Sequence, residues 1–448
     1  MLNPSFFITQ QLNYQSDKII PLSDEEKWNL SAIYSFLSEN NQNIKIADIE
    51  IFGKINKTPS PKEESIFNQN LTPIPPTTFI YPMEEKDNLI FKINHAGYIM
   101  GSPIKFGKLL TTDIDIYLDL DKIVPMHMAV LGTTGSGKTT FIRRFLENIN
   151  EERIKIYIFD IYQEYSKVLN VDNKNILAFK DSLFPIDIGD IKELLKNSGI
   201  DLQERSREEK AIFNLFRKYI KPDLDLIGFN QKNLKEIIEE ASTIRFLERD
   251  IKEQILDFIS ILIKDYSEEA ITSQKENIEL IRKSLDATEK FIIYDLKNIN
   301  NIESRINIVG LILKEIFRKA QLTKEKSLII LEEAHNFAPE KGFGEIQTGR
   351  ENLAFIMAKK IATEGRKFNL GLVAITQRPA NINKYVLSQL NTQVIFKLIN
   401  KNDLDAVSIF FESNKEDIFN LLPFLKPGSC FITGLAVPFG ILAKIKLG

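Results

Sequence analysis

The pattern of apolar and polar residues changes near residue 126. Beyond it, short continuous apolar runs alternate with longer segments that have helical spacing, such as Gly137–Asn150. The runs are HMAVLG (127–132), IKIYIFD (154–160), SLIILEE (327–333), LGLVAITQ (370–377) and TQVIFKL (392–398). Because continuous apolar runs are typical of strands buried on both faces, the pattern predicts an α/β fold with a mostly parallel sheet between helices.

The first part of the chain has a different pattern. Short apolar runs such as Ile44–Ile51 and Asn88–Ile93 alternate with Pro, Asn and Gly, and closely spaced strands with glycine turns are expected from His95 onward. This pattern predicts a small N-terminal β-barrel over residues 1–110, followed by the α/β domain over 111–448. An extended connector without fixed structure is the alternative for the first block.

A long, charged segment lies at about 190–322. Its apolar residues have helical spacing, as at Leu234, Ile237 and Ala241. We interpret it as a helical insertion in the α/β domain.

Composition narrows the class of protein. With 448 residues, of which 43% are hydrophobic and 27% charged, the chain can bury a large core. Neither a long apolar stretch nor a secretory pattern is evident, so we expect no membrane span and no export. The one cysteine, Cys430, excludes an internal disulfide framework and a cysteine-based zinc site. These features predict a cytoplasmic protein.

The segment GTTGSGKT (Gly132–Thr139) lies between a predicted strand and a predicted helix, the context that the phosphate-binding pattern G-x-x-x-x-G-K-[ST] requires. Its glycines let the backbone turn successive N–H groups toward phosphate oxygens. Lys138 places a charge at the β- and γ-phosphates, and the Thr139 hydroxyl is suited to binding Mg²⁺. We therefore expect ATP and Mg²⁺ as cofactors. The expected nucleotide-binding residues are Gly132, Thr133, Thr134, Gly135, Ser136, Gly137, Lys138, Thr139 and Thr140.

Two carboxylates end the run SLIILEE, at the strand end where α/β sheets bind ligands. Glu332 is predicted to hold Mg²⁺, directly or through water, and Glu333 to orient or deprotonate the attacking water. This pair favours a nucleotide hydrolase over a P-loop kinase or a binding protein. A purely structural acid pair at a helix N-terminus is the alternative.

Two further polar positions flank the run LGLVAITQ. Gln377, at its end, either contacts the γ-phosphate or the water, and so senses which nucleotide is bound, or simply ends the strand in a turn before Arg378 and Pro379. Arg366 precedes the run and follows a glycine at the end of a helical segment. It is either a cation that complements the helix dipole or an arginine finger that reaches the γ-phosphate of a neighbouring subunit. In the second case ATP turnover depends on assembly.

Together these motifs resemble the HerA family of the HerA/FtsK superfamily of ring-forming ATPases. The segments that carry the resemblance cover most of residues 95–435. They are HMAVLGTTGSGKTT, FDIYQEY (Phe159–Tyr165), LEEAHNFAPE (Leu331–Glu340), TEGRKFNLGLVAITQRP (Thr363–Pro379) and LLPFLKPGSCFITG. EEAH combined with the EGRK-to-TQRP segment is far more specific than the P-loop alone.

The resemblance implies a RecA-like P-loop ATPase core, assembled as a homohexamer that moves double-stranded DNA through its central channel. It also implies that Arg366 is the finger acting across subunits and that Gln377 is the sensor. Relatives act with a NurA-like partner nuclease in DNA-end processing or with another effector in antiviral defence, so such a partner is expected. The chain departs from the family at Glu332, where Asp is usual, which puts the rate of hydrolysis in question. Asp160 and Glu164 are expected near the nucleotide, at a subunit interface or simply at a strand end.

The residues that contact DNA are less clear from the sequence. The net charge of −3 gives no overall basic surface, although a ring can repeat a few basic side chains around one channel. Pro339–Asn352, after the acidic run, is glycine-rich and contains Lys341 and Arg350. It is either a loop that contacts the phosphate backbone or a solvated surface loop.

Three functions are compatible with the sequence. The first is an ATP-driven DNA translocase or helicase. The second keeps the ATPase but moves protein or single strands, as motors of conjugation and secretion systems do. The third is a nucleotide-gated ring scaffold that assembles and activates a partner effector enzyme.

Overall fold

The computed structural model of the protein divides into two compact units, Met1–Ile99 and Met100–Gly448, and each is considered by itself. The structure describes residues 6–8, 51–55 and 67–68 of the first unit, and 101–181, 195 and 200–445 of the second, with internal gaps. These gaps are 111–112, 114, 151–152, 201–205, 219, 222–225, 228–230, 246–248, 266–267, 341–352, 411–419 and 438–439.

The described part of the first unit is a small antiparallel sheet of three short strands. They are β1 (Phe6–Ile8), β2 (Ile51–Ile55) and β3 (Phe67–Asn68), in the order β1-β2-β3. The remainder of the expected N-terminal barrel lies outside the described residues, so the barrel stays a prediction.

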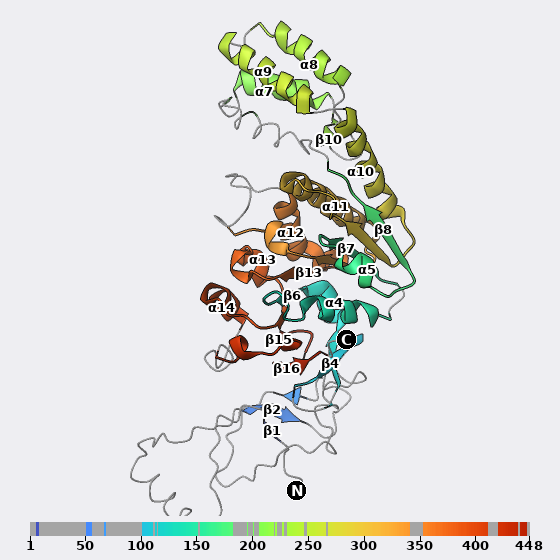
Figure 1. The fold of residues 1–448 in the computed structure, drawn as a ribbon, viewed down its shortest axis with the longest axis vertical. Helices are drawn as coiled ribbons and strands as arrows, with labels where there is room; N and C mark the ends of the chain where they lie inside the picture. Colours follow the sequence, from blue (N-terminus) through green and yellow to red (C-terminus); the bar gives the residue numbers. More distant parts are fainter. Residues whose placement is uncertain are drawn as a thin grey trace, which may run out of the picture. The chain divides into compact units, whose positions relative to one another are not determined.

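The second unit alternates strands and helices along the chain (Figure 1). Its strands are β4 (Pro103–Leu109), β5 (Asp115–Asp119), β6 (Met128–Leu131), β7 (Lys155–Asp160), β8 (Lys174–Ala178), β9 (Ile220–Lys221), β10 (Leu226–Ile227), β11 (Phe291–Asp295), β12 (Ser327–Leu331), β13 (Leu370–Thr376), β14 (Thr392–Ile395), β15 (Ser429–Gly434) and β16 (Ile441–Lys444). Its α-helices are α3 (Leu120–Met126), α4 (Lys138–Glu147), α5 (Glu164–Val168), α7 (Arg207–Arg217), α8 (Gln231–Thr243), α9 (Arg249–Asp265), α10 (Glu268–Asp286), α11 (Ile302–Thr323), α12 (Leu353–Glu364), α13 (Lys384–Ser388) and α14 (Lys401–Val407). Short 3₁₀ turns are η2 (Ala334–Asn336), η3 (Gly365–Phe368), η4 (Pro379–Asn381), η5 (Ser408–Phe410) and η6 (Leu422–Phe424). None of the helices in the described part of the chain is both long and apolar enough to cross a membrane.

The core is an 11-stranded sheet in the order β5-β4-β16-β15-β14-β6-β13-β12-β7-β11-β8. The strands from β14 to β8 pair in parallel, and β6 lies between β13 and β14. All residues of β6, β12, β13 and β14 are buried, as the continuous apolar runs predict. The predicted α/β fold with a mostly parallel sheet is therefore confirmed.

The sheet continues on one side as antiparallel strands. β15 pairs with β14, β16 with β15, β4 with β16, and β5 with β4. Residues 103–119 therefore belong to the core sheet, and the compact units divide after Ile99 rather than at residue 110. The sequence does not reveal this difference locally, because β4 is held by a strand from the other end of the chain.

Most of the segment at 190–322 is helical, and α8 packs against both α7 and α9 (Figure 1). However, β11 lies inside this segment and pairs in parallel with β7 and β8 in the core sheet. The expected helical insertion therefore ends before Phe291, and the helix that follows β11, α11, packs on α12.

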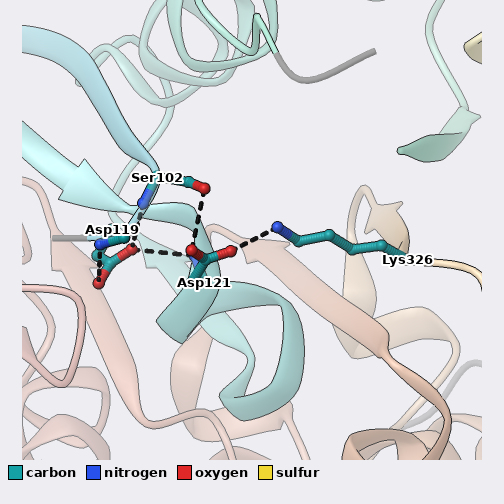
Figure 2. Close-up of polar contacts among 5 residues, drawn as sticks. Ser102, Asp119, Asp121 and Lys326 are labelled. Atoms are coloured by element: carbon teal, nitrogen blue, oxygen red, sulfur yellow. Dashed lines mark hydrogen bonds and ion pairs between the residues drawn. The ribbon is translucent and has the colours of Figure 1, made fainter. Parts of the chain in front are cut away.

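Figure 2 shows a polar cluster that joins the β4–β5 hairpin to the beginning of β12. Asp119 caps α3, with Oδ1 accepting the Asp121 N–H at 3.0 Å and the Ser102 N–H at 3.2 Å. The Asp121 carboxylate accepts the Ser102 hydroxyl at 3.0 Å and pairs with Lys326 Nζ at 2.5 Å. Lys326 directly precedes β12, so the cluster fixes the hairpin at the amino end of the parallel strands.

His127 joins α3 to β6 at the same edge of the sheet. It is 2% exposed, and its Nδ1 accepts the Leu372 N–H of β13 at 3.0 Å. Burial lowers the pKa of His127 to about 4, although a hydrogen bond with the backbone of Ala362 opposes this shift. The folded protein therefore holds a neutral ring where an unfolded chain has a pKa near 6.5.

We predict a pH-dependent loss of stability from this histidine. Below pH 6.5 the unfolded chain takes up a proton on His127 that the folded chain binds only near pH 4. The stabilisation that the neutral ring gives the folded protein is therefore complete above pH 6.5 and is lost as the pH falls. Between pH 7.5 and 5 the difference in unfolding free energy between wild type and His127→Asn should shrink by roughly 2 kcal/mol. Urea unfolding of both proteins at the two pH values measures it. A difference that does not change with pH would show that the ring is not held neutral.

Candidate active site

The glycine-rich loop connects β6 to α4 at the carboxyl edge of the parallel strands. Gly132, Gly135 and Gly137 have φ values of +152°, +74° and +114°, which favour glycine at the last two positions in particular. The Gly132 N–H donates to the Thr376 carbonyl at 3.3 Å, and the Thr133 N–H donates to the Lys397 carbonyl at 2.9 Å. The loop is thus tied to the ends of the two strands that flank β6.

Helix α4 follows because its apolar residues fall on one face. Phe141, Ile142, Phe145 and Leu146 are buried, and Phe141 packs edge-on against Phe396 at 6.1 Å between ring centroids. The helix is thereby fixed with its first residue, Lys138, at the glycine-rich loop.

Lys138 folds back over the loop. Its Nζ donates to the carbonyls of Gly132 at 2.8 Å and Thr133 at 2.9 Å. Burial lowers its pKa, and the nearby Glu333, Glu164 and Glu332 oppose this shift. A cation held above a curled backbone opposite carboxylates is suited to binding an anion such as a polyphosphate.

A segment near the end of the chain also contacts the loop. The Gly428 N–H donates to the Ser136 carbonyl at 2.8 Å, and a Cβ on Gly137 would lie 3.2 Å from the Gly428 Cα. Gly428 itself has a φ of +80°. The sequence analysis quoted this segment but assigned it no role; its signal is the glycine after Pro427 that precedes β15.

The acid pair follows β12, at the same edge of the sheet. Glu332 is 5% exposed, and burial, together with the charges of Glu164 and Asp160, raises its pKa to about 9. Burial likewise raises the pKa of Glu333, against the opposing charge of Lys138. Glu333 has a left-handed backbone (φ +46°), and its buried Oε2 has no hydrogen-bond partner among the described residues. Glu333 therefore lies in the site with an acceptor atom that makes no hydrogen bond to the described residues.

Asp160 and Glu164 lie close to the glycine-rich loop. Thr139 Oγ1 donates to Glu164 Oε2 at 2.6 Å. Asp160 is fully buried and accepts the backbone N–H groups of Glu164, Tyr165 and Ser166 at 2.8–3.1 Å. Asp160 thus holds the first turn of α5, and this turn places Glu164 beside the glycine-rich loop.

These oxygen donors fit Mg²⁺ bound together with a nucleotide. Thr139 and the surrounding carboxylates are the hard ligands that Mg²⁺ prefers. Among the described residues, no group of three or more His, Cys, Asp or Glu side chains is arranged to hold a metal by itself. Mg²⁺ usually takes one or two protein oxygens, with phosphate and water oxygens completing its shell.

Gln377 and His335 link the ends of β13 and β12. Gln377 Oε1 accepts a hydrogen bond from the Thr134 hydroxyl, so its side chain reaches the glycine-rich loop. His335 Nδ1 lies 2.9 Å from Thr376 Oγ1 and 3.2 Å from Glu333 Oε2. Burial, assisted by the charge of Arg378, lowers the pKa of His335 to about 4, so the contact with Glu333 is not an ion pair. The sequence analysis gave His335 no role, although it follows the acid pair in EEAH.

An open cleft of about 990 Å³ adjoins this group of side chains. It is lined by Thr133 and Thr134 of the loop, by Gln377 and Arg378, and by Asp403 of α14, among others. A ligand or a neighbouring chain can therefore approach the glycine-rich loop from this side.

Arg366 is the one predicted catalytic residue that the structure does not bring to the loop. It is exposed in η3, before the first residue of β13, whereas the loop follows the last residue of β6. Because β6 and β13 run parallel, Arg366 lies at the amino ends of these strands and the glycine-rich loop at their carboxyl ends. Of the predicted DNA-contacting residues, Lys341 and Arg350 lie outside the described residues.

The fold and the site together define a P-loop ATPase. Residues 104–316 match the family model "Helicase HerA, central domain". The DNA double-strand break repair helicase HerA of Sulfurisphaera tokodaii is 26% identical, over 76% of this chain and 69% of that protein. The protein of the same name from Pyrococcus furiosus is 24% identical, over 91% of this chain and 78% of that protein. The chain is thus similar to the HerA helicases over most of its length, and its residues 104–316 match their central domain.

The fold is also shared with a more distant solved structure. VirB4 of Thermoanaerobacter pseudethanolicus matches with a TM-score of 0.53 at 15% sequence identity, covering 78% of this chain and 97% of that one.

The contact of Gly428 with the loop predicts that this glycine supports nucleotide binding. A valine there would meet a φ that β-branched residues avoid and would disturb the hydrogen bond to Ser136. We expect Gly428→Val to weaken ATP binding about tenfold or more, measured by titration with a fluorescent ATP analogue. Gly434→Ala is the control, because it also introduces a side chain at positive φ in β15 but lies away from the loop. Equal losses of affinity in both variants would contradict a specific role.

Proposed function

We propose that the protein is a HerA-type DNA translocase: a ring of six identical subunits that couples ATP hydrolysis to movement along double-stranded DNA. The observation that supports a ring is that Arg366 and the P-loop of the same chain lie at opposite ends of the parallel strands. The names of the relatives, DNA double-strand break repair helicases, support DNA as the substrate.

Within one subunit, the proposed site binds MgATP through the glycine-rich loop and its flanking residues. Lys138 leaves the loop carbonyls to meet the β- and γ-phosphates. Thr139 and Glu332 would hold Mg²⁺, which would neutralise phosphate charge, and Glu164 orients the Thr139 hydroxyl by accepting its hydrogen bond. The longer side chain of Glu332 suits binding through water, since its carboxylate lies back against the Ile161 N–H at 3.4 Å.

Hydrolysis requires a group that orients the attacking water. We assign this role to Glu333, whose buried Oε2 is free of hydrogen bonds within the described residues. Gln377 contacts Thr134 at the γ-phosphate end of the loop, so it is placed to respond to the presence of that phosphate. His335 and Thr376 hold the two strand ends together.

Arg366 cannot reach the site of its own subunit. The seven-residue strand β13 separates the two ends of the sheet by roughly 23 Å, at about 3.3 Å per residue. The exposed Arg366 is instead available to an adjoining subunit, whose open cleft leads to Thr134 and Gln377. There its guanidinium would stabilise the charge that develops on the γ-phosphate.

The wider setting follows from the family resemblance. We propose a cytoplasmic complex in which the ring works with a NurA-like nuclease or another effector, in DNA-end processing or antiviral defence.

A translocation assay tests the function directly. Linear duplex DNA should raise the ATPase rate, and the protein should displace a triplex-forming strand from it in an ATP-dependent manner. Lys138→Ala should lose both activities, because the charge at the β- and γ-phosphates is gone, whereas Lys167→Ala, an exposed lysine of α5, should keep them. The alternative is a nucleotide-gated ring scaffold that activates a partner enzyme. It would be established if DNA left the ATPase rate unchanged and a partner enzyme were active only in the presence of nucleotide.

Mixed rings test the position of Arg366. We expect Arg366→Ala to keep ATP affinity within about twofold and to lose turnover by a factor of about 10³ or more. Adding Glu333→Gln subunits should restore part of the turnover, because some sites then combine an intact Glu333 with a neighbour's intact Arg366. Lys138→Ala mixed with Glu333→Gln is the matched control and should stay inactive, since both changes damage a site from within its own subunit.

A further inference from the structure

The ring of His127 lies between the two segments that flank Arg366. Its Nδ1 accepts the Leu372 N–H in β13 at 3.0 Å, and the ring also hydrogen-bonds the backbone of Ala362 in the last turn of α12. A Cβ on Gly365 would lie 3.3 Å from the His127 Cε1. One buried side chain therefore contacts the chain before, at and after the turn that carries the arginine.

The backbone of His127 is strained. Its φ is +64°, in the left-handed region that residues with a side chain rarely adopt. The conformation is fixed by two backbone hydrogen bonds, from its N–H to the Ile123 carbonyl at 2.7 Å and from the Thr392 N–H to its carbonyl at 3.3 Å. Such strain persists where the surrounding structure imposes it, and here it aims the ring at η3.

Two side-chain contacts hold the chain that follows Arg366. Phe368 packs edge-on against Phe317 of α11 at 5.5 Å between ring centroids, and the Asn369 amide donates to the Lys324 carbonyl at 3.1 Å. Both residues follow Arg366. The ring of His127 joins α12 to β13 and lies next to Gly365. It therefore supports the part of the turn that precedes Arg366.

We propose that His127 is a positioning residue for Arg366, which fixes η3 so that the guanidinium meets the nucleotide of the adjoining subunit. The inference rests on the proposed action of Arg366 across subunits. It adds a physical link: β6 begins directly after His127 and ends directly before Gly132, so a single strand of four residues connects a subunit's own P-loop to the residue that supports Arg366. A shift of β6 on nucleotide binding would therefore move both the P-loop and the residue that supports Arg366.

Two substitutions separate this role from a loss of folding. His127→Asn keeps an acceptor for Leu372 while losing the bond to Ala362. His127→Gln offers the longer amide toward Ala362 instead. For each variant that matches the wild-type circular dichroism spectrum, we expect ATP affinity within about twofold of wild type. Turnover should fall by about ten- to a hundredfold, as misplacement of a catalytic group does.

Mixed rings supply the decisive readout. If His127 acts through Arg366, its variants should recover turnover when mixed with Glu333→Gln subunits, as Arg366→Ala should, and unlike Lys138→Ala. Wild-type turnover in the variants alone would overturn the proposal. So would a defect that Glu333→Gln subunits cannot repair although they repair Arg366→Ala; His127 would then act within its own site, and the proposed function would stand. Failure to repair Arg366→Ala itself would remove the proposed function and the role of His127 with it.

Discussion

The parallel register of β6, β13 and β12 is the constraint on which the site depends. Parallel strands present all their carboxyl ends at one edge, so the residues that follow each strand meet there although they are far apart in the chain. The glycine-rich loop, the acid pair and Gln377 are brought together in this way. The same register sends Arg366, which precedes its strand, to the other edge. Within one chain, this sheet therefore keeps the glycine-rich loop and Arg366 apart, at opposite ends of the strands.

Electrostatics at the carboxyl edge explains why the site is suited to a charged ligand. Glu164, Glu332 and Glu333 lie near Lys138, and Glu332 and Glu333 have a raised pKa because burial disfavours their charged forms. A triphosphate alone would add to this negative charge. A divalent cation arriving with it would offset both sets of charges, so nucleotide and metal are expected to bind together.

Much of this architecture could be predicted from the sequence, because the determinants are local. The five apolar runs, the helix after the P-loop and the positions of Glu332, Glu333 and Gln377 follow from short patterns. The missed features depend on contacts between distant parts of the chain. β4 is paired by β16, and β11 is a short run, FIIYD, within charged helices. Glu164 became recognisable as part of the site only once Asp160 was seen to hold the turn that presents it.

The packing of Gly428 on the P-loop has a consequence for how the protein is made. The loop leaves the ribosome early, but the backbone that supports it is among the last parts of the sheet to be synthesised. Until then the loop lacks the hydrogen bond that Gly428 donates to Ser136, so an incomplete chain presents the loop without this part of its support.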